Sequence, residues 1–220
     1  MSHRLWAANW APELATHTLL LYYITDRKQF PGSDAEQREQ LLAKIAEAAH
    51  AGADYIQLRE KDLSTRELEE LARAAVDLIR KSATKTRLLI NSRTDVAIAL
   101  GADGVHLRSH DISPADVRRI WRSAGLTTQP VVVASCHSEE EVKSAKAAGA
   151  DLAVFGPVFG KGNRAGTGIS ALRAACAHGI PVFALGGITA DNARSCIEAG
   201  AAGVAAIRLF QQGAVSRLDS

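Results

Sequence analysis

Short apolar runs alternate with longer amphipathic segments along most of the chain. The runs lie at about 20–25, 55–59, 88–91, 104–107, 131–136, 152–155, 181–185 and 203–207. Runs of this length, rich in Val, Ile, Leu and Ala, predict buried strands. Segments between them, such as Thr65–Lys81 and Ser138–Ala148, carry apolar residues at helical spacing. The pattern therefore predicts strands and helices in strict alternation.

A repeated triplet marks junctions between these helical segments and the strands that follow. Gly-Ala-Asp begins at Gly52, Gly101 and Gly149, and Gly-Ala-Ala begins at Gly200, so the triplets recur 48 to 51 residues apart. Gly favours the left-handed conformation that ends a helix, so each triplet predicts a helix end followed by a strand. Two strand–helix units fit each interval, which predicts one α/β domain, a single (β/α)8 TIM barrel. A doubly wound sheet is the alternative, but it does not require four near-equal repeats.

We expect the barrel to occupy residues 20–220, after a leading segment, 1–19, in which 11–18 would form a short helix. The net charge is +2, from 26 basic and 24 acidic residues, so no electrostatic footprint for nucleic acid or an anionic membrane is present. The three cysteines lie far apart without CxxC spacing, which suggests neither disulfides nor a zinc site. No apolar stretch is long enough to span a membrane and no cleavable signal is visible, so we expect a cytoplasmic protein. The sequence is compatible with a homodimer.

Polar residues accumulate toward the carboxyl end of the stretch Tyr55–Asp62. Arg59 and Lys61 are two positions apart, so on an extended chain both cations point to the same side and can converge on one anionic group. Active sites of such barrels are built at the carboxyl ends of the strands. The alternative is a solvated strand end with a few surface ion pairs.

Other polar residues follow the remaining strands in the same way. Basic side chains from at least four strand ends facing one mouth, in a nearly neutral protein, predict a ligand with several negative charges. Gly186-Gly187 occupies the usual phosphate position of such barrels, where glycines let backbone N–H groups approach oxygen atoms. The candidates are Asp26, Arg27, Gln57, Arg59, Lys61, Asn91, Ser92, Arg93, His106, Arg108, Asp111, Ser135, His137, Lys161, Asn163, Arg164, Gly186, Gly187 and Arg208.

Several candidates have two interpretations. The loop Gly156–Gly168 contains five glycines and could be a mobile lid or an ordinary connection. His137 could act as a general acid/base or cap the helix that follows it. Asp111 could hold magnesium or cap the next helix, and Asp34 could cap the first helix of the barrel. We expect His106 to be a core histidine with a satisfied hydrogen bond.

Taken together, the motifs at the strand ends resemble the thiamine-phosphate synthase/TenI family over nearly the whole chain, from about Leu20 to Phe210. The resemblance depends on the order and spacing of several motifs, and the family fold is the barrel already predicted. The motifs are Ile24–Arg27, Gln57–Asp62, Asn91–Ala97, Gly101–Leu107, Ser135–Ser138, Phe155–Phe159 and Ala184–Ile188.

The resemblance implies an enzyme of thiamin synthesis. In the synthase branch, an aminopyrimidine pyrophosphate is joined to a thiazole phosphate and pyrophosphate is released. Matching positions imply that Arg59 and Lys61 hold the departing pyrophosphate and that Asp111 binds Mg²⁺. The implied substrate-binding residues are Gln57 and Asn91 beside the pyrophosphate, Ser135 in the pyrimidine pocket, Gly187 at the thiazole phosphate, and Gly156, Lys161, Asn163, Arg164, Gly186 and Arg208 around them.

Four positions depart from the synthase pattern. Ser92 replaces a second magnesium carboxylate, and Arg108-Ser109 replaces Gly-Gln. Arg208 stands where a serine is expected, and the lid carries Lys161, Asn163 and Arg164 in place of two threonines and a lysine.

These departures leave two alternatives to the synthase. One is a TenI-like thiazole tautomerase, which needs no magnesium and would use His137 as acid/base. The other is a non-catalytic binder of a phosphorylated thiazole metabolite. Retention of the Arg59–Asp62 stretch and of Asp111 favours the synthase.

Overall fold

A computed structural model describes residues 19–160 and 165–213. The strands are β1 (Leu20–Ile24), β2 (Tyr55–Leu58), β3 (Arg87–Asn91), β4 (Gly104–Leu107), β5 (Val131–Cys136), β6 (Leu152–Phe155), β7 (Val182–Leu185) and β8 (Gly203–Ala206). The helices are a 3₁₀ helix η2 (Arg27–Gln29) and α1 (Asp34–His50), α2 (Thr65–Lys81), α3 (Thr94–Leu100), α4 (Pro114–Ser123), α5 (Glu139–Ala147), α6 (Gly168–Cys176), α7 (Ala190–Glu198) and α8 (Arg208–Gln211).

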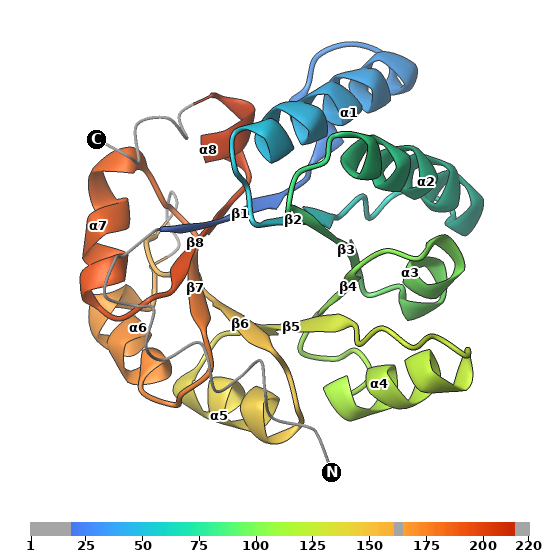
Figure 1. Ribbon diagram of the computed structural model, residues 1–220. Helices are drawn as coiled ribbons and strands as arrows, with labels where there is room; N and C mark the ends of the chain where they lie inside the picture. The colour runs from blue at the N-terminus through green and yellow to red at the C-terminus, as the bar shows by residue number, and fades with distance from the viewer. Residues whose placement is uncertain (1–18, 161–164, 214–220) are drawn as a thin grey trace.

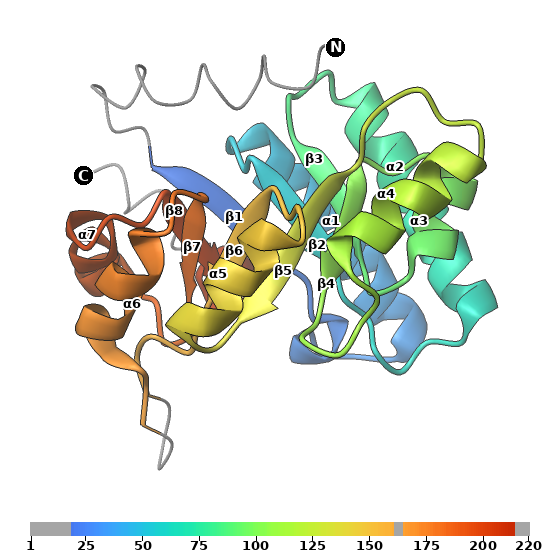
Figure 2. The same cartoon turned by 90° about the horizontal axis from the view of Figure 1, so that it is seen from below.

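All eight strands are parallel and form a closed barrel in chain order, in which β8 pairs with β1. The helices surround the ring of strands (Figure 1). In the side view, α2, α3 and α4 lie on one flank and α6 and α7 on the other (Figure 2). The predicted TIM barrel is therefore confirmed, and every strand boundary lies within one residue of its predicted position. The helix predicted at 11–18 lies outside the described residues.

Two apolar layers hold the barrel together. Side chains that point inward along the strands fill its interior, whereas those that point outward pack against the helices, because successive strand residues face opposite sides. The outer layer includes Trp121 of α4 and Cys136 of β5, both buried. The interior cluster consists of Tyr22, Ile24, Leu89, Val131, Val133, Leu152, Val154, Phe183 and Ala205. With the interior filled by side chains, ligands have access only to the rim.

The Gly-Ala-Asp triplets tie neighbouring strands together at their amino ends. The carboxylates of Asp54, Asp103 and Asp151 accept hydrogen bonds of 2.7–2.8 Å from the backbone N–H of Leu21, Leu88 and Val132, respectively. Each aspartate therefore connects an odd-numbered strand to the even-numbered strand that follows it. The fourth triplet carries Ala202 at this position, which leaves the β7–β8 pair with the backbone bond alone.

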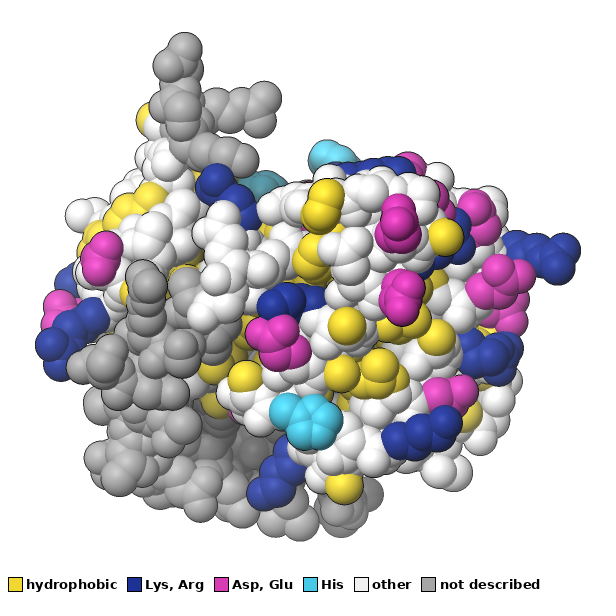
Figure 3. Space-filling view, turned by 90° about the horizontal axis from the view of Figure 1, so that it is seen from above, with side chains coloured by type: hydrophobic (Ala, Val, Ile, Leu, Met, Phe, Trp, Pro, Cys, Tyr) yellow, Lys and Arg dark blue, Asp and Glu magenta, His cyan; other side chains and the backbone are white. Residues whose placement is uncertain are grey.

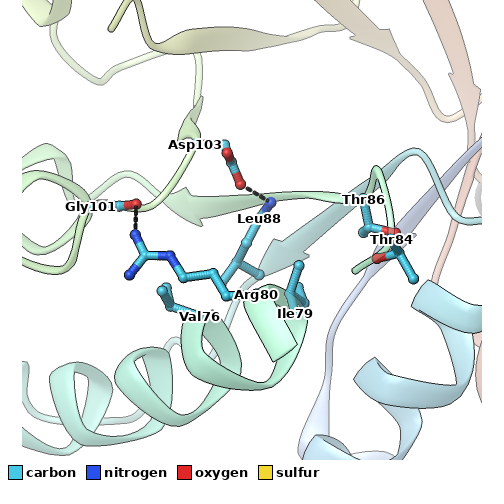
Figure 4. Close-up of a pocket in the computed structure, with 8 residues that line it drawn as sticks. All are labelled: Val76, Ile79, Arg80, Thr84, Thr86, Leu88, Gly101 and Asp103. Carbon is cyan, nitrogen blue, oxygen red and sulfur yellow. Dashed lines mark hydrogen bonds between the residues drawn. The ribbon is translucent and has the colours of Figure 1, made fainter. Parts of the chain in front are cut away.

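A cavity of about 200 Å³ lies at this same end, beneath the carboxyl end of α2 (Figure 4). Arg80 crosses it and donates to the carbonyl of Gly101 at 2.9 Å, while Asp103 accepts from Leu88 N–H. The carboxyl ends of the strands lie at the opposite end of the barrel, where active sites of this fold are built. We therefore assign this cavity a structural role.

Serine residues begin most of the long helices. Ser33 and Ser64 each form a reciprocal capping box, with Glu36 and Glu67 respectively. The prediction that Asp34 caps α1 is wrong, because Asp34 is the first helical residue and its carboxylate pairs with Arg27 instead. Ser113 caps α4, so Asp111 does not have the capping role considered for it.

The last helix is short, and aromatic packing covers the seam where the barrel closes. Leu209 and Phe210 of α8 are buried, and the Phe210 ring stacks on Tyr23 of β1 with centroids 5.0 Å apart. The side-chain amide of Gln211 donates to the carbonyl of Asp26 at 2.9 Å. These contacts join the outer faces of β8 and β1.

The surface carries both signs of charge. On the face shown in Figure 3, basic and acidic side chains are interspersed. Among the helices of the described residues, none is long and apolar enough to cross a membrane.

Candidate active site

Buried Arg27 organises the loop that follows β2. Only 2% of its side chain is exposed, and it donates to Glu60, Asp62 and Asp34 at 2.6–3.1 Å. Hydrogen bonds from Arg27 hold the pKa of Asp62 well below its usual range. Burial raises the pKa of Glu60, and hydrogen bonds from Thr25 and Arg27 partly offset that rise. Since Arg27 binds both Glu60 and Asp62, it fixes the backbone on either side of Lys61.

Arg59 and Lys61 alternate with these two carboxylates along the chain. Arg59 N–H donates to Thr25 Oγ1 at 2.9 Å, which fixes the end of β2 against β1. The nearby charge of Arg59, together with burial and the charge of Arg108, lowers the pKa of Lys61. Within the described residues neither Arg59 nor Lys61 forms an ion pair, whereas Arg108 is paired with Asp111 at 3.0 Å. This arrangement suits a polyanionic ligand.

Hydrogen bonds join the ends of β2, β3 and β4 into one chain. Gln57 Nε2 donates to Asn91 Oδ1 at 2.9 Å, and Asn91 Nδ2 donates to Ser92 Oγ at 3.2 Å. Ser92 Oγ then donates to Asp111 Oδ2 at 2.6 Å. Arg108 binds the same carboxylate through its backbone N–H at 2.7 Å and its guanidinium at 3.0 Å. Burial acts to raise the pKa of Asp111, but the hydrogen bonds from Arg108 and Ser92 outweigh it and lower the pKa.

A second polar chain runs from the barrel interior to the rim. Tyr22 Oη lies 2.7 Å from His106 Nδ1, and His106 Nε2 lies 2.9 Å from Ser135 Oγ. Burial lowers the pKa of His106 to about 3, and the charge of Arg59 acts in the same direction. His106 is therefore the neutral core histidine expected from the sequence, with both ring nitrogens hydrogen-bonded.

The predicted lid begins and ends on the rim near β7. Val158 N–H donates to Leu185 O at 2.8 Å, and Phe159 N–H donates to Gly186 O at 3.0 Å. Gly187 has a φ of +65° and a Cβ there would come within 2.7 Å of Phe159 Cβ, so this position requires glycine. The lid candidates Lys161, Asn163 and Arg164 lie outside the described residues.

The remaining candidates lie apart from the hydrogen-bonded chain. Arg208 is exposed at the start of α8, and within the described residues neither it nor Gly186-Gly187 forms a hydrogen bond or ion pair with the Gln57–Asp111 chain. A cavity of about 480 Å³ opens between the β4–α4 loop and α5, and Asp111 and Ser135 line it. It extends the rim toward α5.

Comparison with known proteins decides the family. A family model described as thiamine monophosphate synthase matches residues 21–210. The chain belongs to this family. A Geobacter sulfurreducens protein named "Putative thiamine-phosphate synthase" is 44% identical over 85% of this chain and 84% of its own length. The thiamine-phosphate synthase of Chlorobium luteolum is 37% identical over 87% of this chain and 84% of its own. The solved thiamine phosphate pyrophosphorylase of Pyrococcus furiosus, at 32% identity and TM-score 0.76, covers 92% of this chain and 95% of that structure.

The family resemblance implies magnesium, and the oxygen atoms around Asp111 fit such an ion only sparsely. Mg²⁺ is commonly held by one or two carboxylates together with substrate phosphates. Asp111 supplies one carboxylate, Ser92 supplies a hydroxyl, and Arg108 competes for both carboxylate oxygens. Within the described residues no group of three His, Cys, Asp or Glu could hold a metal. An ion here would therefore depend largely on oxygen atoms of the substrate.

His137 lies exposed at the end of β5 in this member of the thiamine monophosphate synthase family. Its backbone N–H donates to Glu141 at 2.7 Å, and its Nδ1 donates to Gly156 O at 2.6 Å, since a carbonyl can only accept. Nε2 has no partner among the described residues. Ser138, not His137, caps α5, so the capping interpretation is wrong.

Sequence analysis counted Arg27 among the candidates for anion binding, whereas the structure pairs it with carboxylates, and it assigned no role to Glu60 or Tyr22. Arg27 in η2 and Glu60 after β2 are 33 residues apart in the chain, and no local spacing reports their contact. Tyr22 carries one signal, because its position in β1 places a hydroxyl in the barrel interior, among mostly apolar side chains.

Proposed function

We propose that this protein is a thiamine-phosphate synthase that joins an aminopyrimidine pyrophosphate to a thiazole phosphate and releases pyrophosphate. The observation that carries the proposal is the group of cations, Arg59, Lys61 and Arg108, at one side of the rim. The names of the relatives agree with it. In this reaction the bond from the pyrimidine methylene carbon to the pyrophosphate oxygen breaks, and the thiazole nitrogen bonds to that carbon.

Negative charge develops on the departing pyrophosphate, so cations that are already in place stabilise the transition state. Arg59 and Lys61 are the proposed catalytic residues, and the Gln57–Asn91 pair lies beside them. Ser135 would contact the pyrimidine. Gly186, Gly187 and Arg208 would bind the thiazole phosphate, while Gly156, Lys161, Asn163 and Arg164 would close over the substrates.

Asp111 is the proposed magnesium ligand, together with the Ser92 hydroxyl. When bound, the ion would neutralise charge on the pyrophosphate. Arg108 supplies positive charge at the same place. It would replace part of the charge that is lost if magnesium binds weakly without a second carboxylate. A cytoplasmic location and a homodimer remain predictions from the sequence.

The direct test is incubation of both substrates with and without magnesium, with thiamin phosphate as the measured product. If the protein is a synthase, thiamin phosphate should form. The Arg59→Ala variant should form it much more slowly, whereas Arg87→Ala, at the opposite end of the barrel, should not. No product from the parent protein at any magnesium concentration would contradict the proposal.

One observation favours the thiazole tautomerase as the second candidate. Nε2 of His137 has no hydrogen-bond partner among the described residues, and the histidine is held in place by Gly156 and Glu141. Incubation with the thiazole carboxylate phosphate would then show a shifted double bond, lost in His137→Asn. Magnesium-independent binding of thiazole phosphate with neither reaction would instead indicate the non-catalytic binder.

A further inference from the structure

The chain Tyr22–His106–Ser135 connects the middle of the barrel to its rim, and no role in the reaction has been given to its first two members. Tyr22 is fully buried and His106 is 2% exposed. Ser135 is half-buried and lines the cavity next to Asp111. Tyr22 on β1 reaches His106 on β4, on another side of the barrel, so its hydroxyl crosses the interior to make this bond.

The direction of each hydrogen bond follows from what the buried atoms can do. A neutral imidazole has one N–H donor and one acceptor nitrogen. Within the described residues, the only hydrogen-bond partner of the Tyr22 hydroxyl is His106 Nδ1. If Nδ1 carried the proton, the Tyr22 O–H hydrogen would have no acceptor in an apolar interior that includes Phe183 and Tyr55, which is costly. Tyr22 therefore donates to Nδ1.

The rest of the chain follows from that assignment. With Nδ1 accepting, the proton of His106 resides on Nε2, and Nε2–H donates to Ser135 Oγ. The hydroxyl hydrogen of Ser135 is then not used by His106 and can point toward the rim. With the opposite tautomer, Ser135 would donate to Nε2 and would present only lone pairs to a ligand.

We infer that Tyr22 and His106 are positioning residues that fix Ser135 as a hydrogen-bond donor toward the ligand. Such a site can donate to a ring nitrogen or carbonyl oxygen, which the opposite tautomer could not do because its Ser135 hydrogen would be used by His106. The identity of the ligand rests on the proposed function. An aminopyrimidine carries both acceptor ring nitrogens and a donor amino group, and the inference assigns a ring nitrogen to Ser135.

The tautomer can be measured in the unliganded protein, independently of any activity. Two-bond ¹H–¹⁵N correlations distinguish a protonated imidazole nitrogen from a bare one, and His106→Gln identifies which signals belong to this residue. We expect one proton, on Nε2. A proton on Nδ1, or on both nitrogens at neutral pH, would overturn the inference.

A double-mutant cycle tests whether the orientation matters for binding. Calorimetry with the aminopyrimidine pyrophosphate alone should show that Tyr22→Phe weakens binding about tenfold, the scale of one buried hydrogen bond. In a Ser135→Ala background the same change should have less than a twofold effect, because Tyr22 acts through Ser135. Equal losses in both backgrounds would count against a positioning role.

Tyr55→Phe is the matched control, because Tyr55 packs against Tyr22 and Phe183 but its hydroxyl has no hydrogen bond within the described part of the chain. It should bind like the parent protein. Thiazole phosphate affinity should be unchanged in all variants. Failure to form thiamin phosphate would contradict the proposed function but would leave the tautomer measurement valid. Failure of the proposed function and failure of the tautomer assignment are therefore distinguishable.

Discussion

Ser92 adopts a backbone conformation that its residue type seldom favours. Its φ is +61°, in the left-handed region, at the point where β3 ends and its hydroxyl reaches Asp111. Asp and Asn tolerate this region better than Ser does, because their short side chains bond locally to the backbone. The backbone here is therefore already suited to the aspartate that the family resemblance leads one to expect.

Restoring that aspartate should strengthen magnesium binding. Ser92→Asp adds a second carboxylate next to Asp111, so we expect thiamin phosphate formation to reach half its maximal rate at about a tenfold lower magnesium concentration. Titration of the rate with magnesium gives the value. Ser92→Asn, which shares the backbone preference but lacks the charge, is the control and should not show the shift.

Arg59 should contribute strongly to pyrophosphate binding. It forms no ion pair among the described residues, and a charge-assisted bond contributes about 2–3 kcal/mol. Arg59→Ala should therefore weaken binding of inorganic pyrophosphate roughly 30- to 150-fold by calorimetry. Arg87→Ala removes an exposed arginine at the other end of the barrel and should leave the affinity unchanged. Equal affinities of parent and Arg59→Ala would remove this stretch from the site.

The sequence predicted that the cations Arg59 and Lys61 would face the same way, but it did not predict what holds the loop that carries them. Alternation along an extended chain predicted that Arg59 and Lys61 point to the same side, but β2 ends at Leu58 and Lys61 lies in the turn that follows. Arg27 contacts Glu60 and Asp62 from η2, and such a partnership depends on how the segment after β1 lies against the loop after β2, which no local pattern contains.

At the scale of elements, the triplets do more than end helices. Three of them clamp a strand pair through an aspartate, and the β7–β8 pair lacks this clamp because of Ala202. Sequence analysis identified the triplets from glycine geometry alone. It could not assign the aspartates, because their acceptor role needs a neighbouring strand with a free N–H.

Completing the fourth clamp should stabilise the protein. Ala202 N–H donates to Val182 O at 2.8 Å, as each aspartate does to its own partner, so Ala202→Asp places a carboxylate beside the Val182 N–H. We expect the free energy of unfolding to rise by about 1–2 kcal/mol in urea denaturation. Asp54→Ala should lower it by about 1–3 kcal/mol, since it leaves the Leu21 N–H unpaired. A less stable Ala202→Asp variant would show that the clamp does not transfer.

The α2 capping box should make stability depend on pH. Hydrogen bonds from the Ser64 hydroxyl and backbone, with Arg38 of α1, lower the pKa of Glu67 from 4.5 to about 2. A lowered folded-state pKa means that the contribution is complete above pH 4.5 and is lost as the pH falls through about 2. Glu67→Gln should thus be less stable than the parent at pH 7, with the difference vanishing near pH 2.

Thermal unfolding across this range measures the difference. Glu39→Gln, which changes an exposed glutamate of α1 without an ion pair in the described structure, is the control and should be as stable as the parent at pH 7. A Glu67→Gln deficit that is as large at pH 2 as at pH 7 would rule out the carboxylate as its cause.

At the scale of the molecule, the barrel was predictable because its repeat is visible in the sequence. Near-equal spacing of Gly52, Gly101, Gly149 and Gly200 left few other architectures. The misassigned cap of α1 shows the limit. Ser33 and Asp34 both suit an N-cap by type; Ser33 caps α1 through its box with Glu36, and Asp34 pairs with Arg27 of another element.

Ligand binding should stabilise the whole barrel. Pyrophosphate at 100 times its dissociation constant adds about 2.7 kcal/mol to the free energy of unfolding, which for a domain of this size raises Tm by roughly 5–10 °C. Differential scanning fluorimetry measures it. Arg59→Ala should lose most of the shift at the same pyrophosphate concentration, and an undiminished shift would place the ligand elsewhere.

The pairing of β1 with β8 sets a condition on how the chain is made. Leu20 pairs with Gly203, so the first strand leaves the ribosome long before its second neighbour exists. At the usual rate of translation this interval lasts roughly 10–40 seconds, during which one edge of the growing sheet stays open. An open edge is a template for wrong pairing with other chains. Phe210, which stacks on Tyr23, is synthesised later still, so we expect nascent chains of this protein to depend on cellular chaperones until that contact forms.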